Sequence, residues 1–155
     1  MLYLWYVAYI QGVKVSAIGY SRSKSLWVIN YFNSCGFMEL LPWVGSGYDM
    51  ERFGILPTAS ARHADVLIVS GYITTKGAKR VKMIYDQMPS PRFVMALGSC
   101  PMTGGMYWDS YNTVKNIEEV VPVDVWVLGC PPKPENIGHG IVMAMKAIQG
   151  GFEGH

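Results

Sequence analysis

The sequence is short of cysteine and of charge, and it has no apolar run of membrane-spanning length. Cysteine occurs only three times in 155 residues, without the close C-x2-C pairs typical of structural zinc sites. Charged residues make up 15% of the chain and the formal net charge is +2, which argues against a nucleic-acid-binding surface. The apolar opening, Met1–Ile10, is about half as long as a membrane span. These absences disfavour a zinc module, a nucleic-acid binder and a membrane-spanning chain.

Nucleotide-binding and export signals are also missing. The sequence contains neither G-x-x-x-x-G-K-[ST] nor G-x-G-x-x-G, and its start lacks the basic residues of a signal peptide. An odd cysteine count without an export signal indicates a reducing compartment rather than a disulfide scaffold. We interpret residues 1–24 as an N-terminal docking segment and 25–155 as the main domain; an added strand or a loose terminus is the alternative for Met1–Ile10.

The residues that are abundant point to burial against partners. The chain has 10 methionines, 10 tyrosines and 5 tryptophans, and half of its residues are hydrophobic. This much apolar surface with so little charge is unusual for a free-standing domain. The length is sufficient for one domain with a real core.

Short apolar runs alternate with helical patterns along the chain. Continuously apolar strands are typical of parallel sheets that are covered on both faces, and four are expected: Leu26–Phe32, Asp65–Ser70, Arg92–Leu97 and Val123–Leu128. This alternation predicts an α/β fold with a mostly parallel sheet between two helical layers.

Three helices are expected between or after these strands. A short one over 36–41 ends near Pro42, and a second begins at a Thr74-Thr75 cap and runs to about Met88. The last begins at Pro134, with apolar residues at helical spacing: Ile137, Ile141, Met145 and Ile148. Residues 104–119 give only a weak helical pattern.

All three cysteines follow the ends of predicted strands. Cys35 comes after the first run, while Cys100 and Cys130 directly follow Gly98-Ser99 and Gly129. Because the carboxyl ends of parallel strands open into one crevice, we expect the three thiols to converge. Thiolates favour iron–sulfur clusters, zinc or copper, although a single cysteine is more often a small buried hydrophobe.

A nucleophilic cysteine would need a histidine base. His63, His139 and His155 are the candidates, and surface or packing roles account for them better. No residue has the pattern of a catalytic acid or base, so we expect no catalytic residue on this chain.

Several motifs occur in order along residues 25–149: Tyr48–Gly54, Ala61–Val69, Tyr85–Pro89, Gly98–Cys100, Gly104–Tyr107, Val121–Val125 and Gly129–Glu135. Together they resemble the B-type, 20 kDa subunit of NADH–quinone oxidoreductase (complex I). This family includes small subunits of energy-converting membrane hydrogenases and related archaeal membrane oxidoreductases.

The resemblance implies a flavodoxin-like three-layer fold without flavin, its sheet having four or five strands, and one 4Fe-4S cluster. Cys100 and Cys130 fall on cluster-ligand positions of the family, and with Cys35 they form the expected ligand set. It also implies an electron-transfer subunit of an ion-translocating membrane complex, peripheral on the cytoplasmic side. The implied partners are a large 49 kDa-like or hydrogenase-like subunit, a ferredoxin-like iron–sulfur subunit and membrane-arm subunits, with no nucleic acid.

The chain departs from the family pattern at Gly36. Complex I subunits carry tandem cysteines here, whereas this chain reads Cys35-Gly36. The fourth iron then needs a ligand from a partner, from solvent or from a carboxylate such as Glu39 or Asp49, and Gly36→Cys is expected to restore a fourth thiolate. We therefore favour a modified archaeal type that reduces a sulfur compound, over quinone reduction. A nickel–iron hydrogenase small subunit and a stand-alone flavodoxin-like binding domain without a cluster are the alternatives.

Overall fold

The computed structural model describes residues 17–33 and 35–150, except for the side chain of Cys35. Its centre is a five-stranded, fully parallel sheet in the order β2-β1-β3-β4-β5. The strands are β1 (Leu26–Tyr31), β2 (Ile55–Pro57), β3 (Val66–Ser70), β4 (Phe93–Leu97) and β5 (Val125–Val127). This order matches the flavodoxin-like arrangement of doubly wound sheets, so the predicted fold class is confirmed.

The two central strands are buried along their whole length. Every residue of β3 and of β4 is buried, which explains why both read as unbroken apolar runs. The edge strand β2 was not predicted from the sequence. It has only three residues, two of them exposed, and it ends in Pro57, so it carries too little periodicity to be recognised.

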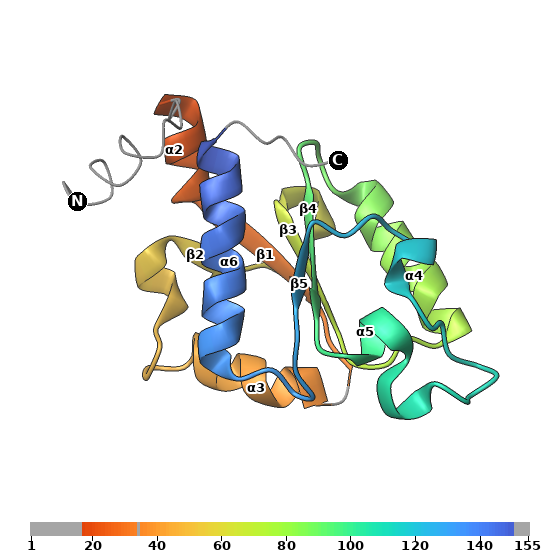
Figure 1. Ribbon diagram of the computed structural model, residues 1–155. Coiled ribbons are helices and arrows are strands. Elements are labelled where there is room, and N and C mark those ends of the chain that lie inside the picture. The colour runs from red at the N-terminus through yellow and green to blue at the C-terminus, as the bar shows by residue number, and fades with distance from the viewer. Residues whose placement is uncertain (1–16, 34, 151–155) are drawn as a thin grey trace.

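Helices cover both faces of the sheet (Figure 1). On one face lie α3 (Cys35–Val44) and α6 (Pro134–Gln149), with α2 (Ala17–Ser23) packed against α6; α4 (Thr75–Gln87) lies on the other. Short elements connect them: α5 (Cys100–Thr103) and the 3-10 turns η1 (Met50–Phe53), η2 (Ala61–His63), η3 (Gly105–Tyr107) and η4 (Ile117–Glu119). These layers leave the carboxyl edge of the sheet bordered by loops and helix starts.

Two predicted helices form as expected. The Thr74 side chain caps α4 by accepting a hydrogen bond from the Gly77 N–H at 3.0 Å. In α6 the four residues at helical spacing are all buried in the core: Ile137, Ile141, Met145 and Ile148. Packing of this apolar stripe against β4 and β5 holds α6 in place.

Two helix predictions are corrected by the structure. Helix α3 continues through Pro42 to Val44; burial of Leu40 and Trp43 in the core outweighs the one backbone hydrogen bond that a proline removes. Trp43 therefore belongs to this chain's own core and not to a docking surface. Residues 104–119 form no continuous helix, because Gly104 is left-handed and Tyr111 is fully exposed.

The described part of the predicted docking segment packs on the main domain. Helix α2 lies against α6, and the Gln149 side chain donates a hydrogen bond to Ser23 Oγ at 2.9 Å. Met1–Ile10 lies outside the described residues. Among the described helices, none is long and apolar enough to cross a membrane.

Candidate metal centre

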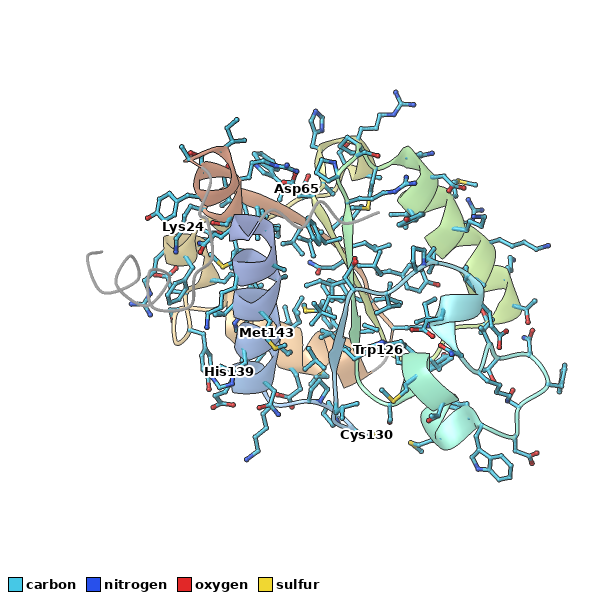
Figure 2. The ribbon with its side chains drawn as sticks, turned by 45° about the horizontal axis from the view of Figure 1, so that its top comes forward. Lys24, Asp65, Trp126, Cys130, His139 and Met143 are labelled. Carbon is cyan, nitrogen blue, oxygen red and sulfur yellow. The ribbon has the colours of Figure 1, made fainter. Side chains whose placement is uncertain are left out.

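Loops from four strands meet in one hollow at the carboxyl edge of the sheet. Figure 2 labels Cys130 at this edge and Asp65 at the opposite one. The lining residues come from the start of α3 and from the loops after β3, β4 and β5: Gly36, Gly71, Leu97, Gly98, Ser99, Cys100, Gly129, Cys130, Pro131 and Pro132. The structure thus brings Cys100 and Cys130 together, as their positions after parallel strands predict.

Backbone hydrogen bonds hold the two cysteine loops side by side. The Gly98 N–H donates to the Val127 carbonyl at 2.8 Å, and the Ser99 N–H donates to the Gly129 carbonyl at 3.0 Å. These bonds continue the β4–β5 pairing beyond the strands themselves. The relative position of the two thiols is therefore set by the sheet rather than by loop side chains.

The two thiols differ in their exposure. Cys100 begins α5 and is 6% exposed, whereas Cys130 is exposed, and the two form no disulfide with each other. Gly105 is left-handed, and a Cβ there would lie 2.7 Å from Cys100 Sγ, so only a glycine backbone can approach the sulfur this closely. One cysteine is thus enclosed by the protein, and the other is accessible to solvent.

The third predicted thiol belongs to Cys35, the first residue of α3. Its side chain lies outside what the structure describes, but Gly36, the next residue, lines the hollow. Within the described residues no group of three histidine, cysteine or carboxylate side chains could hold a metal. Ligation by three cysteines therefore stays a prediction.

The histidines do not complete a catalytic pair with a cysteine among the described residues. His63 lies in η2, just before β3 begins, and so belongs to the amino edge, opposite the cysteines. His139 is an exposed residue of α6, and His155 lies outside the described residues.

The residues around the hollow fit an anionic iron–sulfur cluster. Thiolates are the usual ligands of such clusters, and glycine backbone without side chains surrounds the sulfur positions. Both α3 and α6 begin at this edge, and the positive ends of helix dipoles favour negative charge. Both the cysteine ligands and the helix dipoles are therefore compatible with a negatively charged cluster.

A hydrogen bond joins the loop after α3 to the first turn of α6. Tyr48 donates its phenolic hydrogen to Glu135 Oε1 at 2.7 Å. This bond raises the pKa of Tyr48 and lowers the pKa of Glu135. It ties the segment after α3 to the helix that follows Cys130.

The loops after β1 and β3 are in direct contact. The Asn33 side-chain amide donates to the Tyr72 carbonyl at 2.9 Å. Gly71 is left-handed, and a Cβ there would lie 1.9 Å from the Asn33 carbonyl oxygen. The strand order reverses between β1 and β3, and these contacts hold the two loops together at that position.

Residues 34–144 match the protein family described as NADH ubiquinone oxidoreductase, 20 Kd subunit. The chain belongs to this family. Among its relatives, the B-type subunit of the F420H2 dehydrogenase of Methanosarcina mazei is 43% identical over 132 residues, covering 85% of this chain and 72% of the relative. The B-type subunit of the NADH-quinone oxidoreductase of Chlorobium limicola is 42% identical over 135 residues, covering 86% and 71%. The chain is thus an oxidoreductase subunit of the complex I type.

A solved structure shows the same fold. A chain in the membrane-bound sulfane sulfur reductase, an archaeal respiratory membrane complex, matches with a TM-score of 0.82 and 42% identity, covering 86% of this chain and 76% of that one. With 42% identity, the two chains are similar in sequence as well as in fold, in agreement with the resemblance found in the sequence motifs.

Sequence reasoning missed one residue at this edge, Ser70. It ends β3 as a buried polar side chain after four apolar residues. A serine at the end of an apolar run, directly before Gly71, was the signal available in the sequence.

Proposed function

We propose that this chain holds one 4Fe-4S cluster through Cys35, Cys100 and Cys130 and relays electrons within a membrane oxidoreductase complex. The observation that carries the proposal is the convergence of Cys100 and Cys130, from separate strands, on one hollow that also includes Gly36. Cys35 precedes Gly36 at the start of α3. Family membership supports the same assignment.

The cluster supplies one-electron transfer when bound, and the protein adjusts its potential. Cys100 provides a buried ligand, and Cys130 a solvent-accessible one. The sheet fixes the spacing of these two ligands through the β4–β5 hydrogen bonds. Burial and fixed ligand geometry both reduce rearrangement when the charge changes.

The fourth iron is bound from outside the three cysteines, because Gly36 offers no side chain. We rank a side chain of the partner first, solvent second and an internal carboxylate third. Glu39 is the nearer internal candidate in sequence, one helical turn from Cys35 along α3. Asp49 lies beyond the helix, directly before η1.

We assign the large, 49 kDa-like or hydrogenase-like subunit to the exposed side of α3. Three apolar residues of this helix face outward: Phe37, Met38 and Leu41 are 40%, 65% and 50% exposed. Phe37 and Met38 directly follow Gly36, which lines the hollow, and Leu41 lies one turn further along α3. Such a patch next to a cofactor site suits a permanent partner, to which electrons would pass for reduction of a sulfur compound or a quinone. We further propose that the assembly is peripheral on the cytoplasmic side of the membrane.

The test is iron content in the intact complex, purified through a tag on this chain. Each of Cys35→Ser, Cys100→Ser and Cys130→Ser is expected to reduce iron attributable to this chain and to remove its paramagnetic resonance signal. Thr103→Ala, on the same short helix as Cys100 and exposed, is the control and should keep both. Iron near the wild-type level in all three cysteine variants would overturn the proposal.

A further inference from the structure

Ser70 is a buried hydroxyl without a hydrogen-bond partner among the described residues. Its side chain is 0% exposed, and its Oγ makes no hydrogen bond there. Ser23, the other fully buried serine of the described residues, donates to the Tyr20 carbonyl and accepts from Gln149. Burying a hydroxyl without a hydrogen-bond partner is unfavourable. We therefore look for a hydrogen-bond acceptor for Ser70 in the candidate cluster site.

The side chain of Ser70 faces the start of α3. Side chains alternate along a strand, and Val66 and Ile68 pack in the core cluster that contains α3 and α6, so Ser70 lies on the same face. A Cβ built on Gly36 would be 2.3 Å from Ser70 Cβ and 2.4 Å from Ser70 Oγ. The hydroxyl therefore occupies the space that a side chain at position 36 would take.

The hollow lies next to this hydroxyl. Gly36, which touches Ser70, and Gly71, which follows it, both line the hollow. Leu97, the register partner of Ser70 on β4, lines it as well. Three residues that line the hollow are thus neighbours of Ser70.

We propose that Ser70 is a positioning residue of the cluster site, whose hydroxyl donates a hydrogen bond to a sulfur atom there. This inference rests on the proposed function. Sulfur in a reduced cluster carries more negative charge, so a hydrogen-bond donor stabilises the reduced state and raises the reduction potential. The glycine at position 36 and the serine at position 70 are then explained together, because the missing side chain at Gly36 leaves room for the hydroxyl donor of Ser70.

The test compares Ser70→Ala with wild type in the intact complex, by redox titration of the cluster's paramagnetic resonance signal and by iron content. We expect a downward shift of the midpoint potential with unchanged iron, because alanine removes only the oxygen. The control is Ser23→Ala, a buried serine at the amino edge of the sheet, which should leave the potential unchanged. If the alanine variant does not assemble, Ser70→Gly removes the same donor and is read in the same way.

Two outcomes would overturn the inference. An unchanged potential in Ser70→Ala would show that the hydroxyl does not act on the cluster, and loss of an iron would show that it is a ligand rather than a donor. These outcomes leave the proposed function standing as long as the wild-type complex contains the cluster. A wild-type complex whose copy of this chain holds no cluster would refute the proposed function itself.

Discussion

Replacing Gly36 by cysteine tests the site most directly, because it adds the thiol that the resemblance to complex I subunits implies at this position. The sequence alone predicts a fourth thiolate in this variant. The structure adds a second requirement, since the new Cβ would lie 2.3 Å from Ser70 Cβ. Rotation of the serine side chain moves its Oγ but leaves its Cβ in place. Ser70 ends a fully buried central strand, so the start of α3 has to move instead.

The size of the effect follows from this distance. Ordinary contact begins at 3.4 Å, so the first turn of α3 would have to move by about 1.1 Å. Overpacking of this kind costs about 1–3 kcal/mol. Replacing this glycine by cysteine returns only about a few tenths of a kcal/mol, because cysteine is itself a poor helix former and position 36 lies in the first turn of α3. The net loss is therefore about 1–3 kcal/mol, and each 1 kcal/mol is about a five-fold change in a folding equilibrium.

The assay measures the yield of intact complex, its iron content after oxidation and the midpoint potential of the cluster. Gly36→Cys alone should lower the yield without the full change in potential. The double variant Gly36→Cys with Ser70→Gly removes the obstructing atoms, so it should recover the yield, lower the potential and retain iron on oxidation. Gly47→Cys is the control, because a Cβ at Gly47 meets nothing within 4 Å. Wild-type yield with a lowered potential in Gly36→Cys alone would refute the steric reasoning.

Two further predictions concern the partner surface and pH. Met38→Glu places a charge on the exposed apolar side of α3 and should abolish assembly with the large subunit. The control is Met83→Glu, on the charged outer side of α4 and 48% exposed, which should leave assembly intact. Equal recovery of both complexes by affinity purification would contradict the assignment. Tyr48→Phe removes the hydrogen bond that lowers the pKa of Glu135, so this pKa should rise towards its ordinary value in a carboxyl-carbon NMR titration. Because the pKa of Glu135 is lowered in the folded protein, the hydrogen bond stabilises the fold at pH values above the ordinary carboxyl pKa. This stabilisation is lost as the pH falls through the lowered pKa. An unchanged Glu135 pKa in Tyr48→Phe would contradict the assignment of the shift to this bond.

Local sequence was enough to establish the class of fold and the neighbourhood of the site. Parallel strands that are buried on both faces read as apolar runs, so β3 and β4 were visible in the sequence. The partly buried strands β1 and β5 are also mostly apolar, and Cys100 and Cys130 closely follow β4 and β5. Burial of an apolar stripe likewise made α6 visible. These signals are local, and each depends on the composition of a few neighbouring residues.

Contacts between distant parts of the chain settled the rest. Helix α3 continues through Pro42 because burial of Trp43 in the core stabilises the last turn. The three residues of β2 form a strand only because they pair with β1. Gly36 and Ser70 are 34 positions apart in the sequence. Only the packing of α3 against the end of β3 shows that the Ser70 side chain fills the space that a side chain at position 36 would need. A single sequence shows which side chains are present, but the distance between two backbone segments sets which of them can share one site.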